Sequence, residues 1–219
     1  MSKQIQRHPD AATLVSFAAG TLPEALAATV AAHLSMCKRC RDEVRDMEMI
    51  GAALLSKDAG GDDVSPVNVP ALPDDDAPIV EPRPAKPSEA GELLPAPIAE
   101  RYGLAFDKVP WKRLGPGIWH HKLALSPGVE GDLRLLKISA GRRMPEHGHG
   151  GTELTLVLDG AYSDETGEYG RGDVQDIDDD VEHRPVADQD AGCICLIASE
   201  RPARFKGLVG RLMQPWTGM

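Results

Sequence analysis

Long apolar runs, aromatic side chains and excess positive charge are all scarce in this 219-residue sequence. Phe, Trp and Tyr make up 4% of the residues, and the longest apolar stretches, such as Leu154 to Leu158, are far too short to cross a bilayer. The N-terminal residues lack the apolar core of a signal peptide, so a cytoplasmic location is expected. Lys and Arg number 24 against 34 Asp and Glu, which argues against direct binding to nucleic-acid phosphates.

Cysteine is also rare, and its four residues form two close pairs, Cys37/Cys40 and Cys193/Cys195. In a reducing cytoplasm such pairs are more often metal ligands or plain thiols than structural disulfides.

Apolar residues at helical spacing predict three helices within residues 10–55. Asp10 is expected to cap the first helix and Gly20 to end it. Thr21 and Glu24 predict a capping box at the start of the second helix. The third helix is expected to begin near Cys37 and to carry Val44, Met47, Ile50 and Leu54 on one side.

Nine prolines in residues 57–97 predict a linker or long loop, followed by a short helix at 97–102 that packs back on the first three. From Trp111 onward, short apolar runs separated by Gly-rich and Asp-rich turns predict a β-sandwich or barrel. The predicted strands are Leu133 to Ile138, Glu153 to Leu158 and Cys193 to Ala198, and the predicted turns are Asp159-Gly160 and Gly170 to Asp173.

The segment His33-x3-Cys37-x2-Cys40 predicts an N-terminal zinc site. On a helix end, residues four apart share a face, and two thiolates three apart can hold one ion. His8 is the other histidine in this half and is predicted as the fourth ligand. A closed site with four ligands would be structural or redox-sensing rather than catalytic. The alternative is that the two cysteines are core residues and His33 lies on the surface.

A second site is predicted from His147, His149, Glu153 and His183. Histidines two apart on a strand point to the same face, and three imidazoles with one carboxylate suit zinc or another divalent transition metal. The alternative is that the glycine-flanked His147 and His149 are exposed turn residues. The adjacent His120 and His121 are not predicted as ligands. Cys193 and Cys195 are interpreted as buried core thiols, or else as residues whose oxidation helps to sense an oxidant.

The His-x3-Cys-x2-Cys segment with an upstream histidine resembles the zinc-binding anti-sigma domain of bacterial regulators. The resemblance implies a helical domain, with the 97–102 helix as its fourth, that binds an extracytoplasmic-function sigma factor.

Residues Gly141, His147, His149, Glu153 and Gly160 match the first motif of the cupin superfamily. The second motif is kept only in part, since Gly172 and His183 are present but residues 179–182 replace the usual Pro-x-Gly. This resemblance covers residues 107–200 and implies an all-β jelly-roll barrel.

The two resemblances in this order are those of the ChrR-like zinc-dependent anti-sigma factors. They imply an all-α zinc-binding domain at 1–103, a cupin-like metal-binding domain at 107–200 and a tail at 201–219. The expected function is restraint of an extracytoplasmic-function sigma factor and its release on oxidative stress, with singlet oxygen a signal associated with some members. No catalytic residue, membrane contact or direct contact with nucleic acid is expected. The competing hypothesis is a cupin dioxygenase or isomerase with an accessory zinc module.

Overall fold

The computed structural model describes residues 4–58, 94–144, 147–148, 151–178, 183–201 and 204–205. At residues 57–58, 147–148 and 204–205 it describes the backbone alone. Among the described helices, none is both long and apolar enough to span a membrane.

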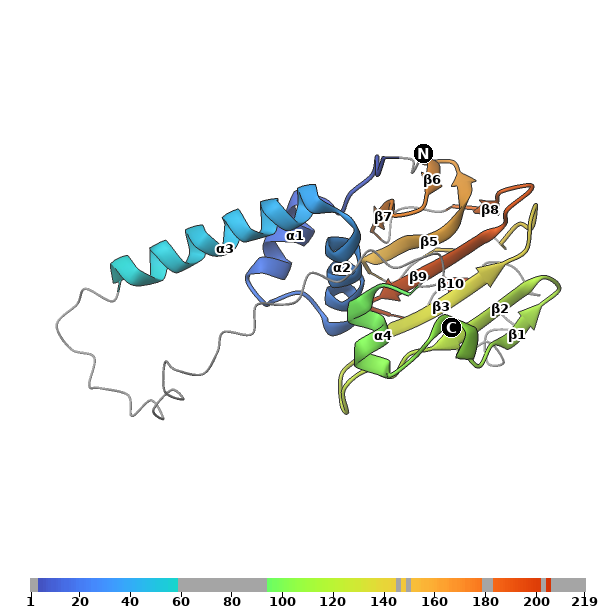
Figure 1. Ribbon diagram of the computed structural model, residues 1–219, viewed down its shortest axis with the longest axis horizontal. Coiled ribbons are helices and arrows are strands. Elements are labelled where there is room, and N and C mark those ends of the chain that lie inside the picture. The colour runs from blue at the N-terminus through green and yellow to red at the C-terminus, as the bar shows by residue number, and fades with distance from the viewer. Residues whose placement is uncertain are drawn as a thin grey trace.

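The described residues before the strands form four α-helices, and the first three follow one another directly in the chain. They are α1 (Ala11–Ala18), α2 (Glu24–Met36), α3 (Lys38–Asp58) and α4 (Ala96–Tyr102). The predicted cap of the first helix is confirmed, since Asp10 Oδ1 accepts a hydrogen bond from Thr13 N at 2.6 Å. The short helix α4 packs against α2, as predicted, and buries Ile98. In Figure 1 α3 extends away from the body while α2 and α4 lie at one end of the sheet.

The predicted capping box at Thr21 is wrong. Helix α2 begins at Glu24 after an extended Pro23, with no side-chain cap. A residue before proline is disfavoured in the helical region, so Leu22 cannot begin the helix. The Thr21 hydroxyl instead donates to the carbonyl of Ser16 at 3.2 Å.

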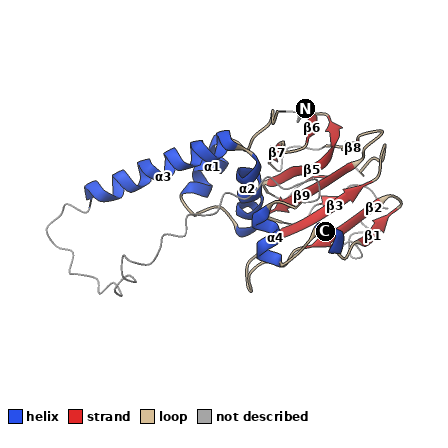
Figure 2. Cartoon of the chain, in the orientation of Figure 1, coloured by secondary structure: helices blue, strands red, loops and turns tan. Residues whose placement is uncertain are grey.

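The described residues from 112 onward form an antiparallel β-structure, so the predicted all-β fold of this part is confirmed (Figure 2). Its main sheet has the order β1-β2-β3-β9-β5-β6, with β7 and β8 also paired to β5, while β4 pairs with β10. The helical turn η1 (Phe106–Lys108) precedes the strands. The strands are β1 (Lys112–Gly115), β2 (Ile118–Lys122), β3 (Asp132–Ile138), β4 (His147–Gly148), β5 (Glu153–Asp164), β6 (Gly167–Gly170), β7 (Val174–Ile177), β8 (Val186–Ala187), β9 (Cys193–Ser199) and β10 (Arg204–Phe205).

The predicted turn at Asp159-Gly160 is also wrong, because β5 runs through it with an irregularity between Val157 and Asp159. Gly160 has φ +68°, and a Cβ there would lie 2.1 Å from the carbonyl oxygen of Gly192. The glycine therefore serves a close approach between strands rather than a chain reversal. The reversal comes at residues 165–166, where Asp164 Oδ1 accepts from Thr166 N at 2.8 Å.

Both faces of the central strands are buried, because the helices cover one of them. Leu133 and Leu135 of β3 share a core with Leu26 and Val30 of α2. Leu136, on the opposite face of β3, packs in a second core with Ile138, Val157, Tyr162, Tyr169, Cys193 and Cys195. A strand buried on both faces has an almost continuous apolar sequence, which accounts for the runs seen in β3, β5 and β9.

The division into domains stays a prediction. The helices and the sheet share a hydrophobic core, so 1–103 and 107–200 are in close contact. Most of the predicted linker 57–97 lies outside the described residues, and β10 falls within the predicted tail at 201–219.

Candidate metal centres

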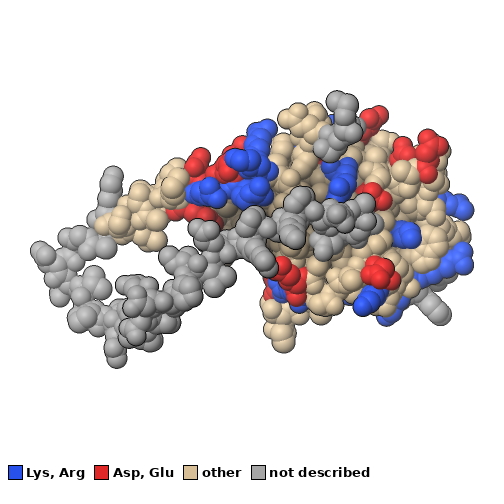
Figure 3. Space-filling view, viewed as in Figure 1, with Lys and Arg blue, Asp and Glu red and all other residues tan. Residues whose placement is uncertain are grey.

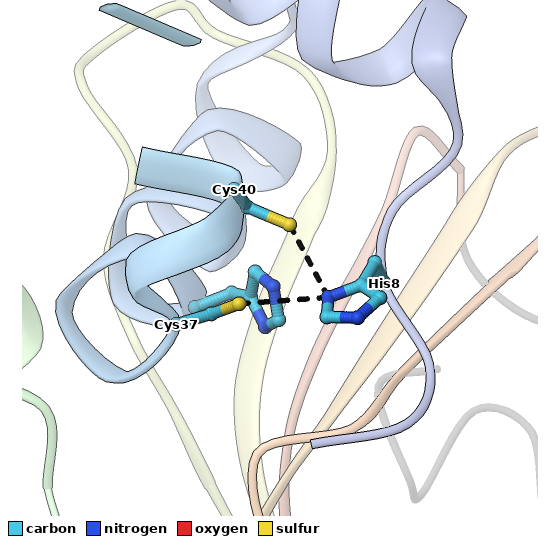
Figure 4. Close-up of side chains that lie close together, drawn as sticks. His8, Cys37 and Cys40 are labelled. Atoms are coloured by element: carbon cyan, nitrogen blue, oxygen red, sulfur yellow. Dashed lines mark hydrogen bonds between the residues drawn. The ribbon is translucent and has the colours of Figure 1, made fainter. Parts of the chain in front are cut away.

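The four predicted N-terminal ligands come together from three places in the chain. His8 lies in the segment before α1, His33 in the last turn of α2, and Cys37 and Cys40 at the junction of α2 and α3. One potential ligand atom from each residue lies within 4.8 Å of all the others. In Figure 4 the His8 ring faces both sulfurs, with its Nδ1 3.5 Å from Cys37 Sγ and 3.3 Å from Cys40 Sγ.

The two ring nitrogens of His33 have different surroundings. Its Nδ1 lies 3.0 Å from the carbonyl oxygen of Gly172, which can only accept, so Nδ1 carries the proton. Its Nε2 is buried and has no hydrogen-bond partner among the described residues. Burial lowers the pKa of His33 to about 4, so the ring is neutral at pH 7 and Nε2 bears a free lone pair. An unpartnered lone pair beside two thiols is the arrangement that a metal ion would satisfy.

The two sulfurs complete a set of two nitrogens and two sulfurs. Cys37 and Cys40 are both buried, and burial together with the neighbouring Cys37 raises the pKa of the Cys40 thiol to about 12. A metal ion binds the thiolate, so binding here would displace the proton. Two imidazoles and two thiolates are a set that structural zinc sites use, and these residues therefore fit zinc.

The site is buried on one side and open on the other. His33 and Cys40 have no exposed surface, whereas a groove of about 870 Å³ borders His8 and Cys37. The rest of its lining comes from Gln4, Ile5, Gln6, Met36, Lys38, Arg39 and Arg171. The groove therefore borders two of the four predicted ligands.

Two contacts to the sheet were missed by reasoning from the sequence. Gly172 supplies the carbonyl that meets His33, and Asp173 accepts hydrogen bonds from the backbone just before His8. In the sequence the run Gly170 to Asp173 was interpreted as a turn, and Gly172 as part of the second cupin motif. No signal in the sequence places a turn so far along the chain beside His8 and His33.

Two of the four predicted ligands of the second site line one small cavity. Glu153 begins β5, as predicted for the head of an apolar strand, and it is buried. His183 is 3% exposed, and both residues border a cavity of about 40 Å³ on the inner face of the sheet. His147 lies in β4, paired with Phe205, but its side chain and all of His149 lie outside the described residues.

Asp164 orients His183 from the end of β5. Its Oδ2 lies 2.8 Å from His183 Nδ1 and also accepts from Gln175 Nε2 at 2.7 Å. Burial opposes ionisation of Asp164, but hydrogen bonds from His183, Thr166 and Gln175 hold its pKa well below the usual range. A carboxylate on one imidazole nitrogen is the contact that fixes the ring of a metal-binding histidine. The residues described at this site therefore suit a metal ion as well.

His120 and His121, which were not predicted as ligands, lie next to each other on β2. The Nδ1 atom of His120 lies 3.2 Å from Arg134 Nη1, and burial lowers the pKa of both histidines. Cys193 and Cys195 are buried on one face of β9 with their sulfurs 3.2 Å apart, and Cys195 borders the cavity of Glu153. Their proposed part in oxidant sensing stays a prediction.

Comparison with known proteins supplies the family. A family model described as the ChrR cupin-like domain matches residues 99–202. The protein named anti-sigma-E factor ChrR from Cereibacter sphaeroides is 39% identical over 212 residues, which cover 97% of this chain and 98% of that protein. This chain belongs to the ChrR family of anti-sigma factors.

One solved structure agrees with membership of the ChrR family. The crystal structure of Rhodobacter sphaeroides SigE in complex with the anti-sigma ChrR matches with a TM-score of 0.70 and 38% identity, over 90% of this chain and 99% of that one. An RmlC-like cupin from Ralstonia eutropha JMP134 matches at 20% identity with a TM-score of 0.42, over 48% of this chain and 72% of that one. That second likeness is too low to bear on function.

Proposed function

We propose that this protein is a cytoplasmic anti-sigma factor that binds and inhibits an extracytoplasmic-function sigma factor and releases it on oxidative stress. The observation that carries the proposal is 39% identity over 97% of the chain to anti-sigma-E factor ChrR, a protein whose family has been crystallised with SigE. Zinc held by His8, His33, Cys37 and Cys40 would fix the α2–α3 junction, which presents α3 to the partner.

The surface of the helices supports this proposal. Five large apolar side chains on α1 and α3 are exposed, between 52% and 75%: Val15, Met49, Ile50, Leu54 and Leu55. Figure 3 shows charged side chains over the first half of α3 and uncharged surface over its far end. Exposed apolar patches of this kind mark sites of protein association. Of the apolar side chains predicted for one side of α3, Val44 lies in the core, whereas Ile50 and Leu54 are exposed. A sigma factor would bury this exposed part of α3.

In this proposal the cupin domain receives the signal. A divalent metal held by Glu153 and His183, with His147 and His149, would supply a redox-sensitive or ligand-sensitive centre. Singlet oxygen is one candidate signal. The open groove beside Cys37 offers a second place for an oxidant to act.

The alternative is a cupin enzyme, and the buried Glu153 beside His183 is the observation in its favour. The cavity bordered by the described residues measures about 40 Å³, whereas pockets for small organic substrates are on the order of 300–1,000 Å³. Turnover of a diketone by the iron-loaded protein would favour this alternative.

Co-expression with a candidate extracytoplasmic-function sigma factor tests the proposal. The full chain should copurify with the sigma factor and inhibit its transcription in vitro. The double substitution Ile50→Asp and Leu54→Asp should weaken the complex at least about tenfold, because it places two charges in an apolar interface. Val129→Asp, at another exposed apolar residue in the β2–β3 connection, is the matched control and should leave binding unchanged. Failure of the wild-type chain to bind or inhibit any such sigma factor would overturn the proposal.

A further inference from the structure

The turn between β6 and β7 contacts His33 of the N-terminal metal group and the segment just before His8. This turn, residues 170–174, connects two strands of the cupin sheet. At its centre the carbonyl of Gly172 accepts the hydrogen bond from His33 Nδ1, at 3.0 Å. The nitrogen that faces the cysteines is therefore set by a residue of the β-sheet, 139 positions further along the chain.

The same turn holds the segment that carries His8. Asp173, which is 4% exposed, accepts hydrogen bonds at Oδ1 from Gln6 N at 2.7 Å and from Arg7 N at 3.0 Å. Val174 N donates to Arg7 O at 3.1 Å. The other oxygen of Asp173 accepts from Gly170 N at 2.8 Å, which closes the turn on itself. His8 follows Arg7 directly, so the Asp173 carboxylate helps to hold the backbone that leads into His8.

Residues on either side of His8 make further contacts with β6 and β7. The Arg7 guanidinium lies 4.8 Å from the centre of the Tyr169 ring and donates from Nε to the carbonyl of Glu168. After His8, the backbone N–H of Asp10 donates to Asp176 Oδ2 at 3.0 Å. The His8 segment thus lies along β6 and β7, as Figure 1 also shows.

Gly172 is required by its conformation and by its packing. Its φ is +89°, and a Cβ would lie 2.7 Å from the side chain of Ile5 and 3.6 Å from that of Met36. Met36 is the residue before Cys37. A larger residue would be strained at this φ and would have to push the Ile5 side chain aside.

The strand that follows the turn borders the cupin cavity through Gln175. Gln175 lies two residues after Asp173 on β7, and its side chain donates to Asp164, the carboxylate that orients His183. Residues 172–175 therefore contact both candidate metal sites, one at each end.

We propose that the β6–β7 turn of the cupin domain is a positioning element of the N-terminal zinc site. The turn orients the imidazole of His33 and holds the backbone that leads into His8, whereas both thiolates come from the α2–α3 junction. Bound zinc joins the junction to the sheet, and a change in the cupin cavity that moves β7 alters how firmly zinc is held. This inference rests on the proposal that His8, His33, Cys37 and Cys40 bind zinc.

Asp173→Asn in the full-length protein tests the inference, because it removes a charge but no ligand. We expect zinc to pass to a chromogenic chelator at least about tenfold faster than from the wild type, which is the usual effect of removing an outer partner of a metal ligand. The matched control is Asp188→Asn. Asp188 also accepts backbone N–H groups in a cupin turn, from Asp190 and Ala191, but in the β8–β9 connection.

A second measurement separates positioning from general unfolding. With Co²⁺ in place of zinc, the visible absorption of a tetrahedral site with two sulfurs should weaken or shift in Asp173→Asn and stay unchanged in Asp188→Asn. Circular dichroism should show the same helix and strand content in both. Release and spectrum equal to the wild type would overturn the inference and leave the proposed function intact. A wild-type protein that binds no zinc at Cys37 and Cys40 would instead overturn the zinc site itself.

Discussion

At the scale of single residues, burial determines the protonation of the N-terminal site. His33 and Cys40 are both completely buried, and burial shifts their pKa values in opposite directions. It lowers the pKa of the imidazole to about 4 and raises the pKa of the Cys40 thiol to about 12. Both groups are therefore neutral at pH 7 without a metal, but only the imidazole is ready to bind one.

The state of Cys40 gives a prediction about pH. Its thiol must lose a proton to bind zinc, so zinc binding at pH 7 should release at least one proton, and affinity should rise with pH. For each proton released, affinity should change about tenfold per pH unit. Calorimetric titration with zinc in two buffers of different ionisation enthalpy measures the number of protons. Cys40→Ser should release fewer protons and bind zinc more weakly, whereas an affinity independent of pH between 6 and 8 would contradict the prediction.

The ligands could be predicted from the sequence because the chemistry that zinc demands restricts both residue type and spacing. His33, Cys37 and Cys40 lie within eight positions, where helix geometry alone brings them together. The outer contacts could not be predicted, because Gly172 and Asp173 reach the site only through the tertiary fold. Asp164 was missed for the same reason, since its position beside His183 depends on the pairing of β5 with β8.

At the scale of secondary-structure elements, apolar periodicity located most helices and strands, and local turn chemistry was the weaker guide. Thr21 and Glu24 have the spacing of a capping box, but Pro23 decides where α2 begins. Asp159-Gly160 has the sequence of a turn, but β5 continues because Gly160 packs against Gly192. In the first case the next residue but one in the sequence, and in the second a contact across the sheet, overrides the conformation that the local sequence favours.

Helix α2 is the element that ties the helices to the sheet, and this gives a prediction about stability. Leu26 is 1% exposed in the core between α2 and the strands. Leu26→Ala should lower the free energy of unfolding by about 2–5 kcal/mol, because it leaves a cavity in that core. Urea unfolding of the zinc-saturated protein, followed by circular dichroism and tryptophan fluorescence, measures the change.

The control for this substitution is Leu55→Ala, at a residue of α3 that is 75% exposed. It should change stability by no more than about 0.5 kcal/mol. The two spectroscopic signals should also give one coincident transition, since the helices and the sheet share a core. Two separate transitions would show that the shared core does not couple them.

At the scale of the whole molecule, the chain order and the spatial order differ. The helices come first in the sequence, yet the segment that carries His8 lies against strands formed more than 150 residues later. The sequence allowed the prediction of an all-α part and an all-β part. It contained no pattern that predicted one face of the sheet to be covered by α2, because the apolar runs of β3 and β9 are compatible with several kinds of burial.

The proposed division of labour predicts the behaviour of a variant of the cupin site. Glu153→Gln removes a charge with little change in shape, and it should weaken metal binding by the cupin at least about tenfold. The complex with the sigma factor should still form, but its release by singlet oxygen should be reduced. Copurification and oxidant-induced transcription measure the two properties separately. The exposed Glu130→Gln is the control, and a normal response in Glu153→Gln would show that the cupin metal does not carry the signal.

The far half of α3 has a consequence for how the protein must be produced. Met49, Ile50, Leu54 and Leu55 are exposed on a helix that extends away from the body (Figure 1). In a chain synthesised without its partner, this exposed apolar surface can associate non-specifically with other proteins. Balanced synthesis of the two partners therefore matters for solubility as well as for regulation, and surplus copies of this chain are the ones most exposed to aggregation and proteolysis.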